Sequence, residues 1–145
     1  MDHFKRINDT LGHLVGDEVL MEIANCLLSA VRSYDFVGRY GGEEFLVVLN
    51  SCDPAFAPTR AEEIRLAISH RPIQTAKGPL SLTMSAGLLL SSEWGIKSLE
   101  ELLHQVDNAL YEAKSAGRDC LRIARPAVKV EPLPAPLPQS VRLRR

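Results

Sequence analysis

The chain has 145 residues, which is enough for one domain with a single hydrophobic core. Its net charge of −1 argues against a general nucleic-acid or membrane-surface binder, because such proteins carry a basic excess. No stretch is apolar over the length of a transmembrane helix. The three cysteines, Cys26, Cys52 and Cys120, lack CxxC spacing, so we expect a reducing cytoplasm rather than a disulfide framework or a zinc site.

The first predicted elements are a helix and a β-hairpin. Apolar residues recur at helical spacing over roughly 17–32 and predict an amphipathic helix. The apolar runs 36–40 and 45–49 follow, separated by Gly-Gly-Glu-Glu at 41–44, and predict a hairpin because glycine supplies the positive φ of tight turns. Side chains alternate along a strand, so Glu43 and its neighbour are expected on opposite faces. These residues alone leave open whether the turn is a site or only a solvated acidic turn.

Two more helices and two strands are predicted further along. A helix over about 54–69 is expected to turn Ala67 inward, and strict alternation over 80–90 predicts a half-buried strand. A capping box at 98–101 predicts the start of the next helix. A short strand over 120–124 is the last predicted element.

The composition changes near the end of the chain. Residues 126–145 include four prolines within seven positions, so this segment can neither pair in a sheet nor continue a helix. We therefore predict a domain over 1–125 and a disordered or polyproline tail over 126–145. A ligand for a proline-recognition module is the alternative to a featureless tail.

Polar residues are dense ahead of the first predicted helix. Asn8 offers both a donor and an acceptor, whereas Asp17 offers acceptors only. A guanine edge needs acceptors for its N1–H and N2–H₂ groups and a donor for O6, so the pair matches it. Local capping of turns is the alternative, since Asn and Asp often have that role.

Six segments, taken in order, resemble the GGDEF family of diguanylate cyclases, in the variant with Glu at the third signature position. They are Asp-His-Phe-Lys at 2–5, Ile-Asn-Asp-Thr at 7–10, Gly-His and Gly-Asp at 12–17, Gly-Gly-Glu-Glu-Phe at 41–45, Thr-Met-Ser-Ala-Gly at 83–87, and Ala-Leu-Tyr-Glu-Ala-Lys at 109–114 with Gly-Arg at 117–118. The resemblance covers about residues 1–124. It implies that two GTP molecules are joined into cyclic di-GMP with release of pyrophosphate, with Mg²⁺ or Mn²⁺ as the cofactor.

The resemblance also implies roles for residues that would contact GTP. Glu43 matches the carboxylate that binds the metal and is proposed as the base on the attacking 3′-hydroxyl. Lys5 matches a lysine that stabilises charge on the transferred phosphoryl group. Asn8 and Asp17 match the pair that reads guanine, and His13 lies at a substrate-contacting position.

Further cations match positions that bind phosphate or product. Lys114 and Arg118 match the pair that holds the terminal phosphates, and their spacing of four would place both on one helical face. Complementing a helix C-terminus is the alternative role for these two cations. Arg32 and Asp35 match the family's RxxD inhibitory site, where a product dimer binds, and Arg65 is a weaker candidate for a secondary contact.

The chain departs from the family pattern at its start. The family's active-site strand normally carries an aspartate immediately before the position of Met1, where it is the second metal carboxylate. Asp2 is the obvious substitute, but its side chain should face the other side of the strand. The family's first helix and most of its first strand are also absent. We therefore expect a fragment or a misplaced start, with poor stability and little or no cyclase activity.

The expected fold class is α+β, an αβ sandwich with a mainly antiparallel sheet flanked by helices, like the palm of nucleotide cyclases. Each domain would hold one GTP and the reaction needs two, so a homodimer is implied, with cyclic di-GMP as product and inhibitor. No nucleic-acid partner is expected. The alternative function is a catalytically impaired module that binds GTP or cyclic di-GMP and relays a signal. A structural fragment without a ligand is the third option.

Overall fold

The computed structural model describes residues 1–95 and 97–126, so the predicted tail lies outside the described residues except for Pro126. The elements in chain order are α1 (Phe4–Leu11), α2 (His13–Ala30), β1 (Phe36–Arg39), β2 (Phe45–Val48), α3 (Ala57–Ser69), β3 (Ile73–Thr75), β4 (Gly78–Leu80), β5 (Ala86–Leu88), the 3₁₀ helix η1 (Ser91–Glu93), α4 (Leu99–Ser115) and β6 (Leu121–Ile123). Within these ranges, no helix is both long and apolar enough to span a membrane.

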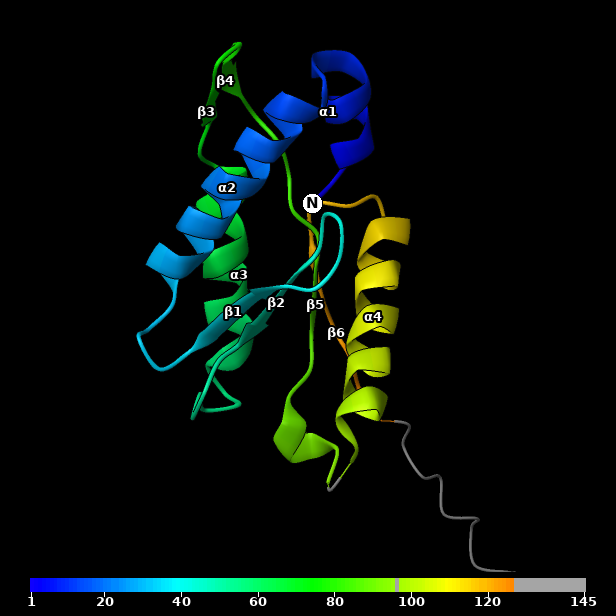
Figure 1. Ribbon diagram of the computed structural model, residues 1–145. Coiled ribbons are helices and arrows are strands. Elements are labelled where there is room, and N and C mark those ends of the chain that lie inside the picture. The colour runs from blue at the N-terminus through cyan, green and yellow to red at the C-terminus, as the bar shows by residue number, and fades with distance from the viewer. Residues whose placement is uncertain (96, 127–145) are drawn as a thin grey trace, which may run out of the picture.

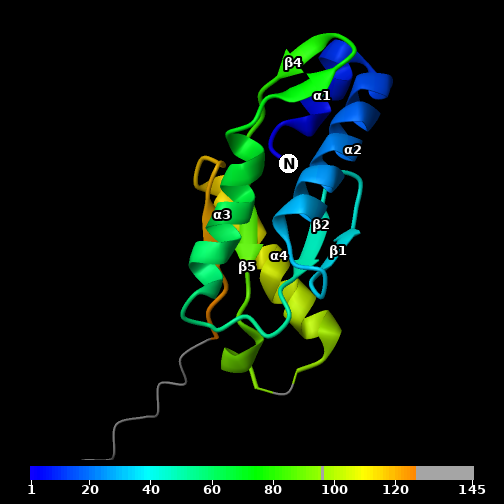
Figure 2. The same ribbon diagram turned by 90° about the vertical axis from the view of Figure 1, so that its left-hand side faces the viewer.

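The described strands form three pairs. The β1–β2 and β3–β4 pairs are antiparallel, and the β5–β6 pair is parallel. Figure 1 and Figure 2 show α2 and α3 on one side of the central strands and α4 on the other. The α+β class expected from the sequence is confirmed.

The main hydrophobic core lies where α1, α2 and α3 meet the chain around residues 82–84. The buried residues of this core are Met1, Phe4, Ile7, Val19, Leu20, Ile23, Leu27, Ile64, Ile68, Ile73, Leu82 and Met84. On the other side, β5 packs closely against α4. A Cβ atom at Gly87 would lie 2.5 Å from the Val106 carbonyl oxygen and 2.7 Å from the Leu110 nitrogen, so only glycine allows this approach.

Helix α1 was missed by the sequence analysis, and α2 begins at His13 rather than near residue 17. Helix α1 is short and buries only Phe4 and Ile7, which is too few apolar positions to show a helical period. Gly12, with φ of 89°, separates the two helices. The polar segment ahead of the first predicted helix is therefore mostly helical.

The hairpin was predicted correctly, but its turn was not. Phe36 pairs with Val48 and Arg39 pairs with Phe45, which leaves a loop of residues 40–44. The Tyr40 and Gly41 nitrogens both donate to the Glu44 carbonyl oxygen, at 2.9 and 3.2 Å. Neither glycine of this loop has a positive φ, because a longer loop does not need the left-handed residues of a two-residue turn.

The predicted strand over 80–90 is interrupted. Residues 81–85 carry no strand assignment between β4 and β5, although Leu82 and Met84 are buried as the alternation required. The capping box of α4 is confirmed, since Ser98 Oγ accepts from the Glu101 nitrogen at 3.1 Å and Glu101 Oε2 accepts from the Ser98 nitrogen at 3.0 Å.

Candidate active site

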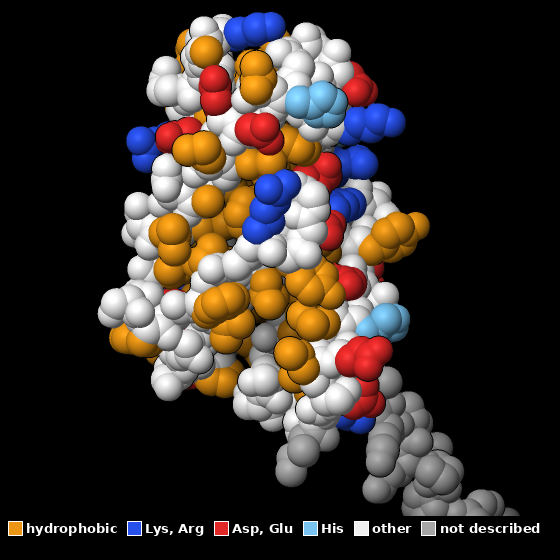
Figure 3. Space-filling view, in the orientation of Figure 1, with side chains coloured by type: hydrophobic (Ala, Val, Ile, Leu, Met, Phe, Trp, Pro, Cys, Tyr) orange, Lys and Arg blue, Asp and Glu red, His pale blue; other side chains and the backbone are white. Residues whose placement is uncertain are grey.

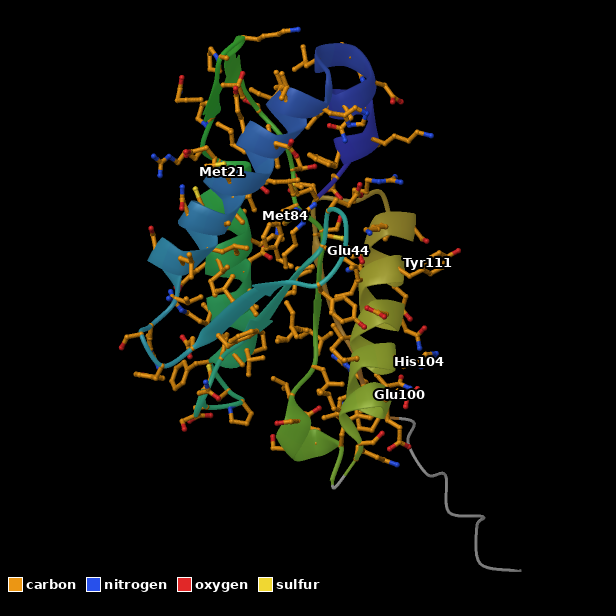
Figure 4. The ribbon with its side chains drawn as sticks, viewed as in Figure 1. Met21, Glu44, Met84, Glu100, His104 and Tyr111 are labelled. Atoms are coloured by element: carbon orange, nitrogen blue, oxygen red, sulfur yellow. The ribbon has the colours of Figure 1, made fainter. Side chains whose placement is uncertain are left out.

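The β1–β2 loop brings two carboxylates to a point where three distant segments meet. Glu44 accepts an ion-paired hydrogen bond from Lys114 Nζ in the last turn of α4, at 2.8 Å. The Glu43 carbonyl oxygen accepts from the Met1 amino group at 3.1 Å. Figure 4 shows Glu44 on the side of the loop that faces α4. Among the described residues, the Glu43 side chain has no hydrogen-bond or ion-pair partner, so its carboxylate is available to a ligand.

Arg39 stabilises this loop and was missed by the sequence analysis. Its Nε donates to the Gly41 carbonyl oxygen at 3.2 Å, and its Nη2 donates to the Gly42 carbonyl oxygen at 2.7 Å. The guanidinium thus holds the backbone immediately before Glu43. The signal in the sequence was an arginine at the last position of β1, facing a loop rich in main-chain acceptors.

Lys114 and Arg118 do not share a helical face, contrary to the prediction. Helix α4 ends at Ser115, and Gly117 and Arg118 then have φ of 108° and 66°. Arg118 therefore extends from a turn after the helix, where its nitrogen donates to the Ala113 carbonyl oxygen at 3.1 Å. Both cations remain at the same end of α4, and the Arg118 side chain is exposed.

The residues predicted to read guanine lie at the junction of α1 and α2. Asn8 Oδ1 is buried and has no hydrogen-bond partner among the described residues. It packs against Gly16, where an added Cβ would lie only 1.9 Å from it. Asp17 follows Gly16 in the chain and is exposed. Lys5 on α1 and His13 at the start of α2 are also exposed.

A groove of about 420 Å³ runs from Asp17 between α2 and the hairpin. Its lining residues are Asp17, Leu20, Met21, Ala24, Leu28, Val37, Gly38, Arg39 and Phe45. Hydrophobic side chains gather over α2 and the hairpin in Figure 3. Small-molecule sites typically have this size and this mostly apolar lining with a few placed polar groups, here Asp17 and Arg39.

The candidate inhibitory pair lies at the opposite end of the hairpin from the acidic loop. Arg32 Nη1 donates to the Tyr34 hydroxyl at 2.9 Å, and the guanidinium lies 5.8 Å from the centre of that ring. Asp35 accepts from the Arg32 and Asn50 nitrogens, both at 2.9 Å. The Asp35 carboxylate is therefore used in the local turn, whereas Arg32 is exposed.

Arg65 is not at the surface, so its expected role as a secondary product contact is wrong. Its side chain is only 6% exposed and forms a two-point ion pair with Glu62, with N···O distances of 2.7 and 2.9 Å. It also donates to the Met84 carbonyl oxygen at 3.1 Å and pairs with Asp119. The hydrogen bonds from Arg65 hold the pKa of Glu62 below its usual value.

Asp2 lies ahead of α1, where residues 1–3 carry no strand assignment, and its carboxylate is bound inside the domain. It is 3% exposed, and it accepts from Thr83 Oγ1 at 2.8 Å, Ser85 Oγ at 2.7 Å and the Asp119 nitrogen at 3.1 Å. Burial opposes ionisation of this carboxyl, but the three hydrogen bonds together outweigh it and lower the pKa of Asp2. Asp2 is thus a buried structural acceptor. Within the described ranges, no three His, Cys, Asp or Glu side chains are grouped so that they could hold a metal ion.

Comparison with known proteins decides the family. The model of the family described as diguanylate cyclase, GGDEF domain, matches residues 1–120. The chain belongs to the GGDEF family. The GGDEF match covers every segment that forms the site described above, from α1 through the turn after α4.

Two relatives show the extent of the GGDEF similarity in sequence. Diguanylate cyclase DgcP of Pseudomonas aeruginosa is 44% identical over 124 residues, which are 86% of this chain and 18% of the relative. Response regulator PleD of Caulobacter vibrioides is 43% identical over 123 residues, which are 83% of this chain and 27% of the relative. The chain thus spans less than a third of the length of either protein.

Solved structures show the same GGDEF fold. The active GGEEF domain of a diguanylate cyclase from Vibrio cholerae aligns with a TM-score of 0.75 at 35% identity, covering 87% of this chain and 79% of that one. The GGDEF domain of DgcB from Caulobacter crescentus, solved in complex with c-di-GMP, aligns with a TM-score of 0.75 at 31% identity, covering 85% and 72%. The nucleotide-cyclase-like fold expected for this chain is therefore confirmed.

Proposed function

We propose that this GGDEF domain binds GTP and condenses two GTP molecules into cyclic di-GMP, releasing pyrophosphate. The observation that carries the proposal is the meeting of the acidic loop with the cationic end of α4, documented by the 2.8 Å pair between Lys114 and Glu44. Phosphoryl transfer depends mainly on positioning and on neutralising charge, and this arrangement supplies cations beside a free carboxylate. The relatives named diguanylate cyclase support the same activity.

The junction of α1 and α2, where the groove reaches Asp17, is the proposed guanine site. With Oδ1 directed at Gly16, the Asn8 amide nitrogen is the end left to donate to O6, while Asp17 accepts from N1–H and N2–H₂. The apolar lining from Leu20 onward would exclude water from the base. The two helices therefore supply both halves of the recognition from one junction.

We assign the phosphates of GTP to three cations, two at the end of α4 and one on α1. Lys114 and Arg118 would hold the terminal phosphates, and Lys5 would neutralise charge on the transferred phosphoryl group. His13 is the remaining proposed contact with the nucleotide. Glu43 is the proposed base, since its carboxylate has no partner among the described residues and can accept the proton of a 3′-hydroxyl.

The residues around Glu43 fit a magnesium ion that arrives with the nucleotide. Mg²⁺ is commonly held by one or two carboxylates together with substrate phosphates and waters, so Glu43 can serve where no three-ligand protein cluster exists in the described ranges. When bound, the ion would neutralise negative charge on the phosphates. Asp2 is occupied by its three hydrogen bonds and Glu44 by Lys114, so among the described residues near the loop Glu43 is the carboxylate left to hold the ion. We expect slow turnover for that reason. Mn²⁺ has similar ligand preferences.

Two copies of the domain are needed for the proposed reaction. The groove and the acidic loop provide one guanine site and one base per chain, whereas each 3′-hydroxyl must attack the α-phosphate of the other GTP. We therefore propose a homodimer with the two sites face to face.

The proposal is tested by incubating the 145-residue protein with GTP and MgCl₂ and measuring cyclic di-GMP by liquid chromatography. We expect product at a low rate, and a further loss of about a hundredfold or more in Glu43→Gln, the usual range for removing a general base. Glu100→Gln is the matched control, because Glu100 is exposed near the start of α4, far from the acidic loop (Figure 4). If the wild-type protein and its Glu100→Gln control form no product above a no-enzyme blank, the cyclase proposal is refuted.

A receptor without turnover is the second proposed function. Asp2 is occupied by Thr83, Ser85 and Asp119, so within the described ranges only the Glu43 carboxylate is left unpaired near the loop. Arg32 remains exposed for a product ligand. Calorimetric titration with cyclic di-GMP separates the two functions. Tight binding that Arg32→Ala abolishes, without any turnover of GTP, would support the receptor.

A further inference from the structure

The turn that carries Arg118 has an unfavourable backbone. Gly117, Arg118 and Asp119 have φ of 108°, 66° and 45°, so two residues with side chains adopt the left-handed region in succession. Such conformations are disfavoured for residues other than glycine and persist only where the surroundings fix them. The surroundings of this turn therefore determine where Arg118 lies.

Asp119 is held from two sides. Its backbone nitrogen donates to Asp2 Oδ2 at 3.1 Å, and its carboxylate pairs with Arg65. Asp2 is itself fixed by hydroxyl donors from Thr83 and Ser85, at 2.8 and 2.7 Å. The turn is thus attached to the buried interior by one main-chain contact and one side-chain contact.

Arg65 provides the side-chain attachment in a fixed orientation. Two of its nitrogens are bound to Glu62 in the parallel geometry that suits a planar guanidinium, and the third donates to the Met84 carbonyl oxygen as well as to Asp119. A group held at three points cannot rotate, so the carboxylate that pairs with it is also fixed. A lysine could not reproduce this arrangement with its single point charge.

Arg118 has no comparable support for its own side chain. It is exposed, and among the described residues it forms no ion pair, whereas Lys114 is held by Glu44. We propose that Arg65 is a positioning residue for the terminal phosphates of bound GTP, acting through Asp119 on the turn that carries Arg118. This inference rests on the proposed function, in which Arg118 contacts those phosphates.

The test compares the affinities of the 145-residue protein for GTP and for GMP, measured by calorimetry in MgCl₂. We expect Asp119→Ala to lower the GTP to GMP affinity ratio about tenfold through weaker GTP binding, the effect of weakening one charge-assisted contact, with GMP affinity unchanged. Asp119→Asn keeps an acceptor for Arg65 and tolerates a positive φ, so it should recover most of the ratio. Arg65→Lys should lower the ratio as Asp119→Ala does.

The Arg118→Ala background shows whether the effect passes through Arg118. In the Arg118→Ala background, Asp119→Ala should produce no further fall in the GTP to GMP affinity ratio. A further fall would overturn the inference. A lower melting temperature of Asp119→Ala with an unchanged ratio would also overturn it, because the pair would then only stabilise the fold. If Arg65→Lys fails to fold, the Asp119 variants decide the question, since that side chain is 51% exposed. A wild-type protein that binds GTP no better than GMP would refute the proposed function itself.

Discussion

Replacing Gly16 with alanine tests how closely α1 and α2 are packed at the proposed guanine site. The new Cβ would lie 1.9 Å from Asn8 Oδ1 and 3.0 Å from its Cγ, so the Asn8 side chain must move. Overpacking of this kind costs about 1–3 kcal/mol. Alanine in the interior of a helix gains roughly 0.5–1 kcal/mol over glycine, which offsets part of that cost. We therefore expect Gly16→Ala to lower the free energy of unfolding by about 1–2 kcal/mol.

The matched background is Asn8→Ala, which removes the atoms that the new methyl group would meet. The remaining neighbour is Phe4 Cζ at 3.3 Å, which needs only a small adjustment. In that background, Gly16→Ala should be neutral or slightly stabilising, which gives a coupling free energy of roughly 2 kcal/mol between the two sites. Urea denaturation followed by far-ultraviolet circular dichroism measures all four proteins.

The same substitution should affect ligand binding, since a displaced Asn8 cannot donate to guanine. We expect GTP affinity to fall about tenfold in Gly16→Ala, as for the loss of one hydrogen bond to a ligand. An equal loss of stability in both backgrounds would refute the packing argument. Unchanged GTP affinity despite the coupling would refute the assignment of Asn8 to guanine.

Three further predictions concern stability. Folding lowers the pKa of Asp2, so its contribution to the free energy of unfolding is present above the unfolded pKa of about 3.9 and is lost as the pH falls through the folded pKa. Melting temperatures between pH 6 and pH 3 should therefore fall less steeply in Asp2→Asn than in wild type. An equally steep fall in both proteins would contradict this. Gly87→Ala should lower the free energy of unfolding by about 1–3 kcal/mol or more, because its Cβ would meet main-chain atoms of α4 that cannot rotate away, and a neutral result in urea denaturation would disprove the close approach. Ser98→Ala should cost about 1 kcal/mol by removing the capping box, with Ser92→Ala as a control in the same urea assay that should stay within about 0.5 kcal/mol of wild type.

The features that the sequence predicted correctly depend on neighbours along the chain. The capping box needs only Ser98 and Glu101, and the hairpin needs only two apolar runs with a polar break between them. The acidic loop could be singled out for the same reason. The order of short segments then predicted the family, because each segment consists of neighbouring residues and can be matched without knowledge of the fold.

The features that were missed depend on partners far away in the chain. Helical periodicity placed Ala67 inward on α3, but the structure exposes Ala67 and buries Arg65, whose partner Asp119 is 54 residues further on. The spacing of Lys114 and Arg118 suggested one helical face, but the helix ended between them. No local pattern reports a buried ion pair or the exact end of a helix, since both are decided by tertiary contacts.

The acidic loop is attached to the rest of the domain differently from the strands that carry it. Val37 and Val47 pack against the core, whereas beyond the strands the Lys114–Glu44 pair joins the loop to α4 through side chains that are 27% and 36% exposed. Such a pair contributes no more than about 1 kcal/mol and is weakened by added salt. We therefore expect added salt to weaken the attachment of the loop to α4 more than it weakens the apolar packing beside α2.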